Sequence, residues 1–419
     1  MAHRHVLILT SNVPPFASGG TPRLLRECEC LPRQGWRVSV AGFSGQWQLP
    51  QLDPLPKSTT AWPVNVEPWW YRHVRRLKKI FSREDEKAVN GARPDKYLEL
   101  LPGLLKVVER AVRRNPPDII MVTIPSFSLL DAGFLARLDS LAPGRVVIER
   151  RDRFAHNPWH TRSEADIARA EAIERAAGPF VAGVTDDSQL FADTVKTWAP
   201  RALTEVISNG FVREHYVGKS LGLAWPGRRE GVLRFQFVGR AYAHAVVRLL
   251  VPAFQRALVL RPELAPRLRF RFIGQFQPEF LGDWSDLGST LELCDPIPYA
   301  EIPGAVERAD VSTLVVADNA VSQGQPAAKV FEYLGASRPI LAASNGAAAE
   351  IVRITQSGIT ANPHDPEALA AAILGFDDLW QADQPFPLGP QSLRDPWEAN
   401  ALAKKQAVFF ERIIARKSG

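Results

Sequence analysis

Short apolar runs rich in β-branched residues alternate with amphipathic stretches along most of the chain. In the first half, this pattern predicts strands at His5–Thr10, Arg37–Ala41, Ile119–Thr123, Arg145–Glu149, Phe180–Val184 and Thr204–Ser208. Helical periodicity between them predicts helices at Arg23–Gln34, Pro94–Arg114, Arg162–Ala177 and Asp187–Trp198. Strands that alternate with helices form βαβ units around a parallel sheet. The first half is therefore predicted to be an α/β domain.

The second half repeats this architecture without repeating the sequence. Its predicted strands are Leu233–Val238, Arg269–Gly274, Thr290–Leu293, Val311–Val316 and Pro339–Ala343. Its predicted helices are Val246–Leu260, Ile302–Ala309, Ala327–Ala336, Ala347–Ile354 and Pro366–Leu374. We expect an N-terminal domain at 1–210, a connection rich in Gly and charge at 211–231, and a second domain at 232–396. A last helix, 397–419, is expected to pack back on the first domain.

Composition narrows the class of protein. The chain has 419 residues, of which 46% are hydrophobic and 23% charged, as in ordinary globular proteins, so a disordered chain is excluded. Its longest uncharged apolar run, near 119–130, is shorter than the ~20 residues of a membrane span, and no signal-peptide core follows His5. Three cysteines without a second pair predict no zinc site. These features predict a cytoplasmic protein.

The excess of positive charge is local. The formal net charge is +6, and the segment Trp69–Arg83 holds six Lys or Arg and no acid, so the rest of the chain is neutral. This argues against a nucleic-acid-binding surface. The segment places an apolar stripe opposite its bases, a pattern typical of a helix on an anionic membrane surface. An amphipathic helix packed on the domain core explains the stripe equally well.

Two loops that follow predicted strands carry candidate ligand-binding residues. In the first, Gly19 and Gly20 let backbone N–H groups approach a phosphate or sugar closely, although a flexible turn also explains them. The spacing differs from a dinucleotide-binding fingerprint. In the second, Gly239 and Arg240 end a strand, where an Arg can hold a diphosphate in a bidentate way. A surface Arg at a strand end is the simpler alternative.

The second half has two further strand-to-helix segments with candidate ligand-binding residues. Lys329 and Glu332 share one face of a predicted helix, where a carboxylate suits the paired hydroxyls of a ribose. An ordinary i, i+3 surface ion pair is the alternative. Gly346 opens the next predicted helix, whose N–H groups could bind phosphate, or which Ser344 or Asn345 could simply cap.

A loop of the first half adds two polar candidates. Asp152 and His156 follow a predicted strand and could hydrogen-bond to hydroxyl groups of a substrate. Pairing of Asp152 with a neighbouring Arg, and a plain loop position for His156, explain them as well. The residues alone do not choose between these interpretations.

The ordered set of motifs resembles the retaining GT-B glycosyltransferases of family 4. The resemblance covers the opening strand with its Gly-Gly loop, ISNGF at 207–211, FVGR at 237–240, KVFEYLGASRPILA at 329–342, and NGAAAEIV at 345–352. It implies two Rossmann-like parallel-sheet domains facing a central cleft. The nucleotide-sugar donor is then expected mainly on the C-terminal domain.

The resemblance also implies roles for individual residues. Glu332 matches the second Glu of the E-x7-E motif, which holds the ribose, and Arg240 matches the diphosphate-binding Arg. Gly19 and Gly20 match the loop beside the diphosphate. Gly324 stands where the first Glu is expected, and 241–247 lacks the usual Lys, for which Arg248 or Lys329 could substitute.

These features predict a hexosyltransferase that moves a sugar from a nucleotide diphosphate sugar to a hydroxyl acceptor with retention. The catalytic candidates are Arg240, Lys329, Asp152 and His156, with no metal and no cofactor besides the sugar nucleotide. The place of Trp69–Arg83 in the acceptor half favours a lipid-linked or other glycan precursor as acceptor and a peripheral position on the membrane. The alternatives are a catalytically silent GT-B subunit and a non-transferring nucleotide-sugar enzyme of the same fold.

Overall fold

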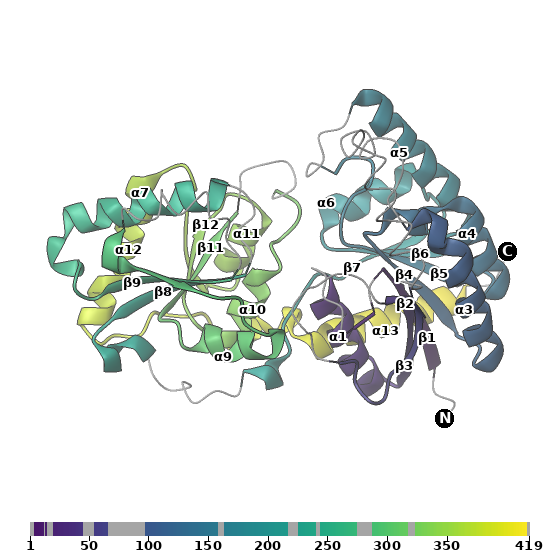
Figure 1. Cartoon of the computed structure of the whole chain (residues 1–419), viewed down its shortest axis with the longest axis horizontal. Coiled ribbons are helices and arrows are strands. Elements are labelled where there is room, and N and C mark those ends of the chain that lie inside the picture. The colour runs from purple at the N-terminus through teal and green to yellow at the C-terminus, as the bar shows by residue number, and fades with distance from the viewer. Residues whose placement is uncertain are drawn as a thin grey trace, which may run out of the picture. The chain divides into compact units, whose positions relative to one another are not determined.

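The computed structural model describes residues 4–11, 13–14, 20–44, 54–65, 97–157, 163–216, 225–239, 244–274, 287–316 and 323–416. The chain forms two compact units, Met1–Ser208 with Leu402–Gly419, and Asn209–Ala401. Figure 1 follows the chain through both units. The predicted segment Trp69–Arg83 lies outside the described residues.

The first unit is built on a parallel sheet with the strand order β3-β2-β1-β4-β5-β6-β7. The strands are β1 (Arg4–Thr10), β2 (Trp36–Ser44), β3 (Thr60–Asn65), β4 (Ile119–Ile124), β5 (Val146–Arg150), β6 (Gly183–Asp186) and β7 (Leu203–Val206). Every residue of β4 is buried, which is why it reads as one continuous apolar run. The edge strand β3 contains Pro63, which interior strands rarely tolerate, and the sequence pattern did not predict it.

Helices cover both faces of this sheet. They are α1 (Thr21–Cys30), α3 (Leu101–Arg114), α4 (Ala132–Leu141), α5 (Glu164–Ala177), α6 (Gln189–Ala192) and α13 (Ala399–Ala415). The helices α3, α4 and α5 share one apolar core with the sheet. On the other face, the Phe410 ring of α13 lies 5.0 Å from the Trp36 ring of β2. The predicted helix at 187–198 is instead α6 followed by a 3-10 turn, Asp193–Thr197.

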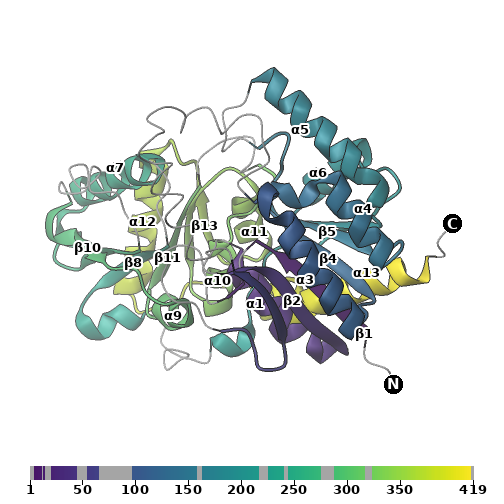
Figure 2. The ribbon, with the colours of Figure 1, turned by 45° about the vertical axis from the view of Figure 1, so that its right-hand side comes forward.

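The second unit has six parallel strands in the order β10-β9-β8-β11-β12-β13. They are β8 (Leu233–Val238), β9 (Leu268–Ile273), β10 (Leu291–Cys294), β11 (Val311–Val315), β12 (Ile340–Ala343) and β13 (Gly358–Ala361). The helices are α7 (His244–Leu260), α9 (Ile302–Glu307), α10 (Lys329–Ala336), α11 (Ala347–Ile354) and α12 (Pro366–Gln381). The helices α7 and α12 lie side by side over one apolar core (Figures 1 and 2). The helices α9, α10 and α11 contribute to a separate core.

The second unit begins earlier than the sequence pattern predicted. Phe211 and Tyr216, which fall in the expected connection, are buried in the apolar core beneath α10. The Phe211 N–H donates to the Trp397 carbonyl at 3.1 Å, and the Ala399 N–H donates to the Phe211 carbonyl at 2.8 Å. The two stretches in which the chain passes between the units are therefore hydrogen-bonded to each other within the second unit.

Helix α13 returns the chain to the first unit. The Arg412 guanidinium donates to Glu205 at 2.8 Å, and the Lys405 ammonium donates to the Val206 carbonyl at 2.7 Å. A Cβ at Gly183 would lie 2.6 Å from Ile413 and 2.8 Å from the Phe409 ring, so β6 needs glycine where the helix crosses it. Among the helices that the structure describes, none is long and apolar enough to cross a membrane.

Candidate functional site

In the second unit, the strand order reverses between β8 and β11. Ligands of open parallel sheets bind outside the carboxyl ends of the strands at such a point. Tyr333 of α10 connects both strands here, because its hydroxyl accepts from the Val238 N–H at 3.3 Å and donates to the Thr313 carbonyl at 3.2 Å. Burial raises the pKa of Tyr333, so the hydroxyl stays protonated and keeps its donor. This bridge fixes α10 beside the reversal.

The side chain of Lys329, the first residue of α10, runs along Gly239. A Cβ at position 239 would lie 2.5 Å from Lys329 Cε, and the φ angle of Gly239 is +126°, so both space and backbone require glycine. The Lys329 ammonium lies 4.9 Å from the centre of the Phe237 ring. Burial lowers the pKa of Lys329 to about 8. In the described part of the chain no carboxylate pairs with this ammonium, so an anion bound there would supply the missing charge.

Glu332 lies one turn further along α10 and has different neighbours. Its two carboxylate oxygens accept hydrogen bonds from two tyrosine hydroxyls, that of Tyr216 and, at 3.3 Å, that of Tyr299. Between Lys329 and Glu332, both of which are described, no ion pair forms, so the i, i+3 ion-pair alternative is wrong. Each oxygen of a carboxylate has two lone pairs, so Glu332 keeps acceptor sites for further hydroxyl groups.

Gly346 is the N-cap of α11, at the end of β12. Its own N–H donates to the Ser344 hydroxyl at 3.3 Å, and Gly346 has no side chain with which to cap the first turn of the helix. Backbone N–H groups at the start of a helix suit an anion.

Two of the predicted residues, Gly19 and Arg240, lie outside the described residues, whereas Gly20 is described. The Arg151 guanidinium donates to the Gly20 carbonyl at 2.6 Å. A Cβ at position 20 would lie 1.9 Å from Arg151 Nη1, so an alanine here would displace this side chain. Glycine at position 20 therefore makes room for Arg151 in the described structure.

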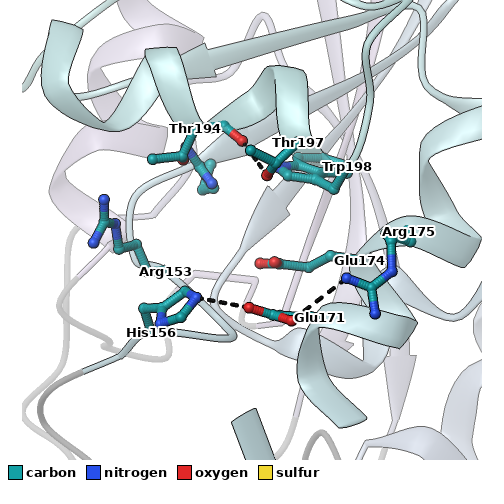
Figure 3. A pocket seen from close by; sticks show the side chains of 9 residues that line it. Arg153, His156, Glu171, Glu174, Arg175, Thr194, Thr197 and Trp198 are labelled. Atoms are coloured by element: carbon teal, nitrogen blue, oxygen red, sulfur yellow. Dashed lines mark hydrogen bonds and ion pairs between the residues drawn. The ribbon is translucent and has the colours of Figure 1, made fainter. Parts of the chain in front are cut away.

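His156 lines a cavity of about 220 Å³ in the first unit (Figure 3). Its Nε2 lies 3.0 Å from the Glu171 carboxylate, which also pairs with Arg175 at 3.4 Å. The remaining lining side chains are Arg150, Arg153, Glu174, Thr194, Thr197 and Trp198. Asp152 is half-buried in the same loop and does not line this cavity. The structure thus brings together one of the two predicted loop residues with charged and hydroxyl side chains.

A buried charge cluster that the sequence analysis did not include lies at the carboxyl ends of β5 and β6. Arg23 of α1 lies 2.6 Å from Glu149 and 2.6 Å from Asp187, and it donates to the Ile207 carbonyl at 2.7 Å. Glu27, one turn along α1, pairs with Arg23 at 3.5 Å. The spacing of four residues between Arg23 and Glu27 was the one local signal, because Glu149 and Asp187 are far from Arg23 in the sequence.

The three acids of this cluster differ in pKa. The Arg23 guanidinium holds the pKa of Glu149 at about 2 against the effect of burial. Burial raises the pKa of Glu27 well above its usual range, and Glu149 beside it adds to the effect. Burial also raises the pKa of Asp187, to about 7. Within one cluster, the protein therefore favours the charged form of Glu149 and disfavours the charged form of Glu27.

Two residues of the second unit were missed for a similar reason. Tyr216 lies 116 positions before Glu332 and Tyr299 lies 33 positions before it, so no local motif joins them. Together, the described residues of α10 and the start of α11 offer a cation without a described counter-ion, a helix N-terminus whose N-cap is glycine, and a fixed carboxylate. This arrangement suits a ligand that carries both negative charge and neighbouring hydroxyl groups.

Solved structures with the same architecture span nearly the whole chain. Sucrose-phosphate synthase from Thermosynechococcus elongatus has a TM-score of 0.61 at 14% identity and covers 98% of this chain and 96% of its own. The α,α-trehalose 6-phosphate synthase from Burkholderia multivorans has a TM-score of 0.64 at 13% identity, with 98% of both chains covered. Anabaena HepE, in complex with UDP and glucose, has a TM-score of 0.60 at 14% identity and covers 98% and 100%.

These likenesses and the two parallel-sheet units define the fold as GT-B, as predicted. Residues 233–376, most of the second unit, match the model of the family Glycosyl transferases group 1. This match bears out the predicted family resemblance for most of the second unit. Among curated proteins, no sequence matches the chain significantly.

Proposed function

We propose that the protein transfers a hexosyl group from a nucleotide diphosphate sugar to a hydroxyl acceptor. The observation that carries this proposal is the ammonium of Lys329, which has no counter-ion among the described residues and lies one helical turn from the Glu332 carboxylate. Lys329 would bind the diphosphate, and Glu332 would accept hydrogen bonds from the ribose. The UDP in the structure of Anabaena HepE supports this class of ligand.

The proposed chemistry needs stabilisation of the leaving group. The bond between the anomeric carbon and the diphosphate oxygen breaks, a bond to the acceptor oxygen forms, and the proton of the acceptor hydroxyl passes to the departing diphosphate. Negative charge grows on the departing diphosphate, so Lys329, Arg240 and the N-terminus of α11 at Gly346 would bind the transition state more tightly than the ground state. Gly19 and Gly20 would lie beside the same diphosphate.

Retention of configuration and independence of divalent metal are part of this proposal. Retention follows from the resemblance of the motifs, whereas metal independence is expected because the sequence has no Asp-x-Asp motif after a predicted strand. Gly324 in place of the first Glu of E-x7-E makes both points informative to test. The configuration of the product can be assigned by NMR, and activity can be compared with and without EDTA. An inverted product, or activity abolished by EDTA and restored by Mg²⁺, would contradict these points.

The first experiment is a thermal-shift screen of nucleoside diphosphates, beginning with UDP. A ligand at ~100 times its dissociation constant raises the free energy of unfolding by ~2.7 kcal/mol, which is easily detected. Transfer and hydrolysis are then measured with the matching nucleotide sugars. Arg240→Ala should slow transfer more than it lowers the melting temperature. Absence of any stabilising nucleotide would sink the proposal.

The acceptor belongs to the same proposal. We propose a lipid-linked or other glycan precursor, which the basic, aromatic segment Trp69–Arg83 would meet at an anionic membrane surface. Sedimentation with neutral and anionic liposomes tests this, using a variant in which Arg75, Arg76, Lys78 and Lys79 become Glu. We expect binding to anionic liposomes alone, lost at high salt and in the variant. Equal sedimentation with both lipids would contradict it.

A second candidate function is a silent GT-B subunit that binds a sugar nucleotide without turnover. Gly324, which replaces an acid of the family motif, favours it. The nucleotide-sugar panel separates the two functions, because a silent subunit is stabilised by nucleotides yet gives neither transfer nor hydrolysis.

A further inference from the structure

The carboxylate of Glu332 is held by two tyrosines from different segments of the second unit. Tyr216 ends the stretch Phe211–Tyr216, and Tyr299 begins the 3-10 turn Tyr299–Glu301 that precedes α9. Each hydroxyl donates to a different oxygen, Tyr216 to Oε2 and Tyr299 to Oε1. A carboxylate held at both oxygens has lost the rotation about its last side-chain bond that a free Glu keeps.

The ring of Tyr216 packs closely against one position of α10. Gly335 lies one turn after Glu332, and a Cβ at that position would lie 2.4, 2.7 and 2.8 Å from three atoms of the Tyr216 ring. The backbone of Gly335 is helical and has no need of glycine by itself, so the close approach of the ring is the requirement. The same ring packs edge-on against Phe211 at 6.3 Å between centres, and Tyr216 is 6% exposed.

We propose that Tyr216 and Tyr299 are positioning residues of the donor site, which fix the Glu332 carboxylate in the orientation that accepts the two ribose hydroxyls. This inference rests on the proposed function. Preorganised acceptors bind more tightly because the ordering cost has been met before the ligand arrives. Each phenol uses one lone pair of one carboxylate oxygen. One lone pair remains on each oxygen, so the carboxylate can accept one hydrogen bond from each of two neighbouring hydroxyls.

We call the pair Tyr216 and Tyr299 the clamp. In a nucleoside diphosphate the ribose diol is the one pair of neighbouring hydroxyl groups that Glu332 could bind, which gives the test its selectivity. The probes are UDP and 2′,3′-dideoxy-UDP, or the corresponding pair for the base that the thermal-shift screen selects. Both carry the base and diphosphate, and only the first carries the hydroxyls that Glu332 would bind. Affinities are measured by isothermal titration calorimetry on the full chain.

The variants remove the clamp in two independent ways. Tyr216→Phe and Tyr299→Phe delete one hydroxyl each and keep the ring, whereas Gly335→Ala keeps the Tyr216 hydroxyl and displaces its ring. Tyr97→Phe, the same chemical change in the core of the first unit, is the control. Tyr299 is only partly buried, so its variant decides the question if Tyr216→Phe fails to fold.

We expect the wild type to bind UDP at least about tenfold more tightly than the dideoxy analogue, as hydrogen bonds to a charged acceptor require. Each clamp variant should weaken UDP binding about three- to tenfold and change dideoxy-UDP binding by less than about twofold. The control should bind both ligands as the wild type does.

Three results would overturn the inference, and they are distinguishable. If the wild type prefers UDP and the clamp variants bind UDP equally tightly, the tyrosines do not position Glu332, and the proposed donor site stands. If the wild type binds UDP and dideoxy-UDP equally, Glu332 does not bind the ribose, whereas the proposed transfer, which rests on Lys329, is decided by the thermal-shift screen and the nucleotide-sugar panel. Equal loss of affinity for both ligands would indicate a general structural role instead of positioning.

Discussion

The carboxyl ends of the two sheets hold buried charge in opposite ways. In the first unit, Arg23 pairs with Glu149 and Asp187 at 2.6 Å each, and its side chain is only 3% exposed. In the second unit, Lys329 has no described counter-ion, and Glu332 is held by neutral phenols. Charges that satisfy one another hold a structure together, whereas charges kept apart remain available to a ligand. The contrast assigns a stabilising role to the first cluster and a binding role to the second.

The largest effect is expected for Arg23→Met, which removes the nearest cation from the buried Glu149 carboxylate and leaves only Arg151 at 4.0 Å. Removing one partner of a buried ion pair costs about 3–5 kcal/mol, so the free energy of unfolding should fall by that amount. Urea denaturation at pH 7 measures it. A variant as stable as the wild type would show that the cluster contributes nothing to the fold.

Two controls sharpen this result. Arg33→Met breaks an exposed pair with Glu29 at 3.0 Å and should cost less than about 1 kcal/mol. Glu27→Gln should also cost much less than Arg23→Met, because burial raises the pKa of Glu27 and so disfavours the charge that this substitution removes. A large loss on Glu27→Gln would instead show that Glu27 is the ionised member of the cluster.

The next effect concerns ligand binding in the second unit. Glu332→Gln replaces a charged acceptor of hydrogen bonds by a neutral one, so the affinity for the nucleoside diphosphate should fall by about 1.5–3 kcal/mol, roughly 10- to 100-fold. Calorimetric titration measures this change, and the urea midpoint should stay close to that of the wild type. An unchanged affinity would show that Glu332 does not bind the donor.

A smaller, pH-dependent effect is expected at Lys329. Its pKa is about 8 in the folded protein against 10.5 ordinarily, so the free protein loses this charge as the pH rises through 8. Affinity for the diphosphate should therefore fall between pH 7 and pH 9, and Lys329→Arg should flatten the dependence. Between pH 8 and 10.5 the unfolded chain binds more protons than the folded one, so stability without ligand should rise with pH there.

The smallest effect is expected for His156→Gln in the cavity of the first unit. The side chain of His156 is 57% exposed and that of Glu171 is 37% exposed, so their pair contributes less than about 0.5 kcal/mol. Stability should hardly change, which leaves the rate of transfer as the informative measurement. A lower rate of transfer at unchanged stability would support the predicted contact between His156 and a substrate. An unchanged rate would show that His156 is a loop residue without a role in transfer.

The fold was predictable because the buried strands and the amphipathic helices of both units have different patterns of apolar residues in the sequence. The fully buried strand β4 is almost entirely apolar, as parallel strands covered on both faces usually are. In β8 apolar residues alternate with Arg234 and Gln236, and the predicted Leu233–Val238 agrees with this strand at both ends. Errors occurred where local signals are weak: β3 contains Pro63, and β13 is a four-residue strand that begins with Gly358. Helix α12 continues to Gln381, seven residues beyond its predicted end.

The candidate site was predictable only where it is local. Lys329, Glu332 and Gly346 follow strands in sequence, so motif spacing located them. The partners that decide their chemistry come from distant segments: Gly239 beside Lys329, and Tyr216 beside Glu332. Likewise, Arg23 meets Glu149 only because α1 crosses the ends of β5 and β6. Sequence spacing cannot report such contacts, since tertiary packing alone creates them.

The return of the chain through α13 has a consequence for the order in which the protein is made. Phe409, Phe410 and Ile413 cover one face of the first unit's sheet, yet residues 209–401, the whole second unit, are synthesised before them. At ~5–20 residues per second, translation of that insert takes roughly 10–40 s. During that time the sheet face beneath α13 stays uncovered on the ribosome, so the nascent first unit is a natural client for chaperones that bind exposed apolar strands.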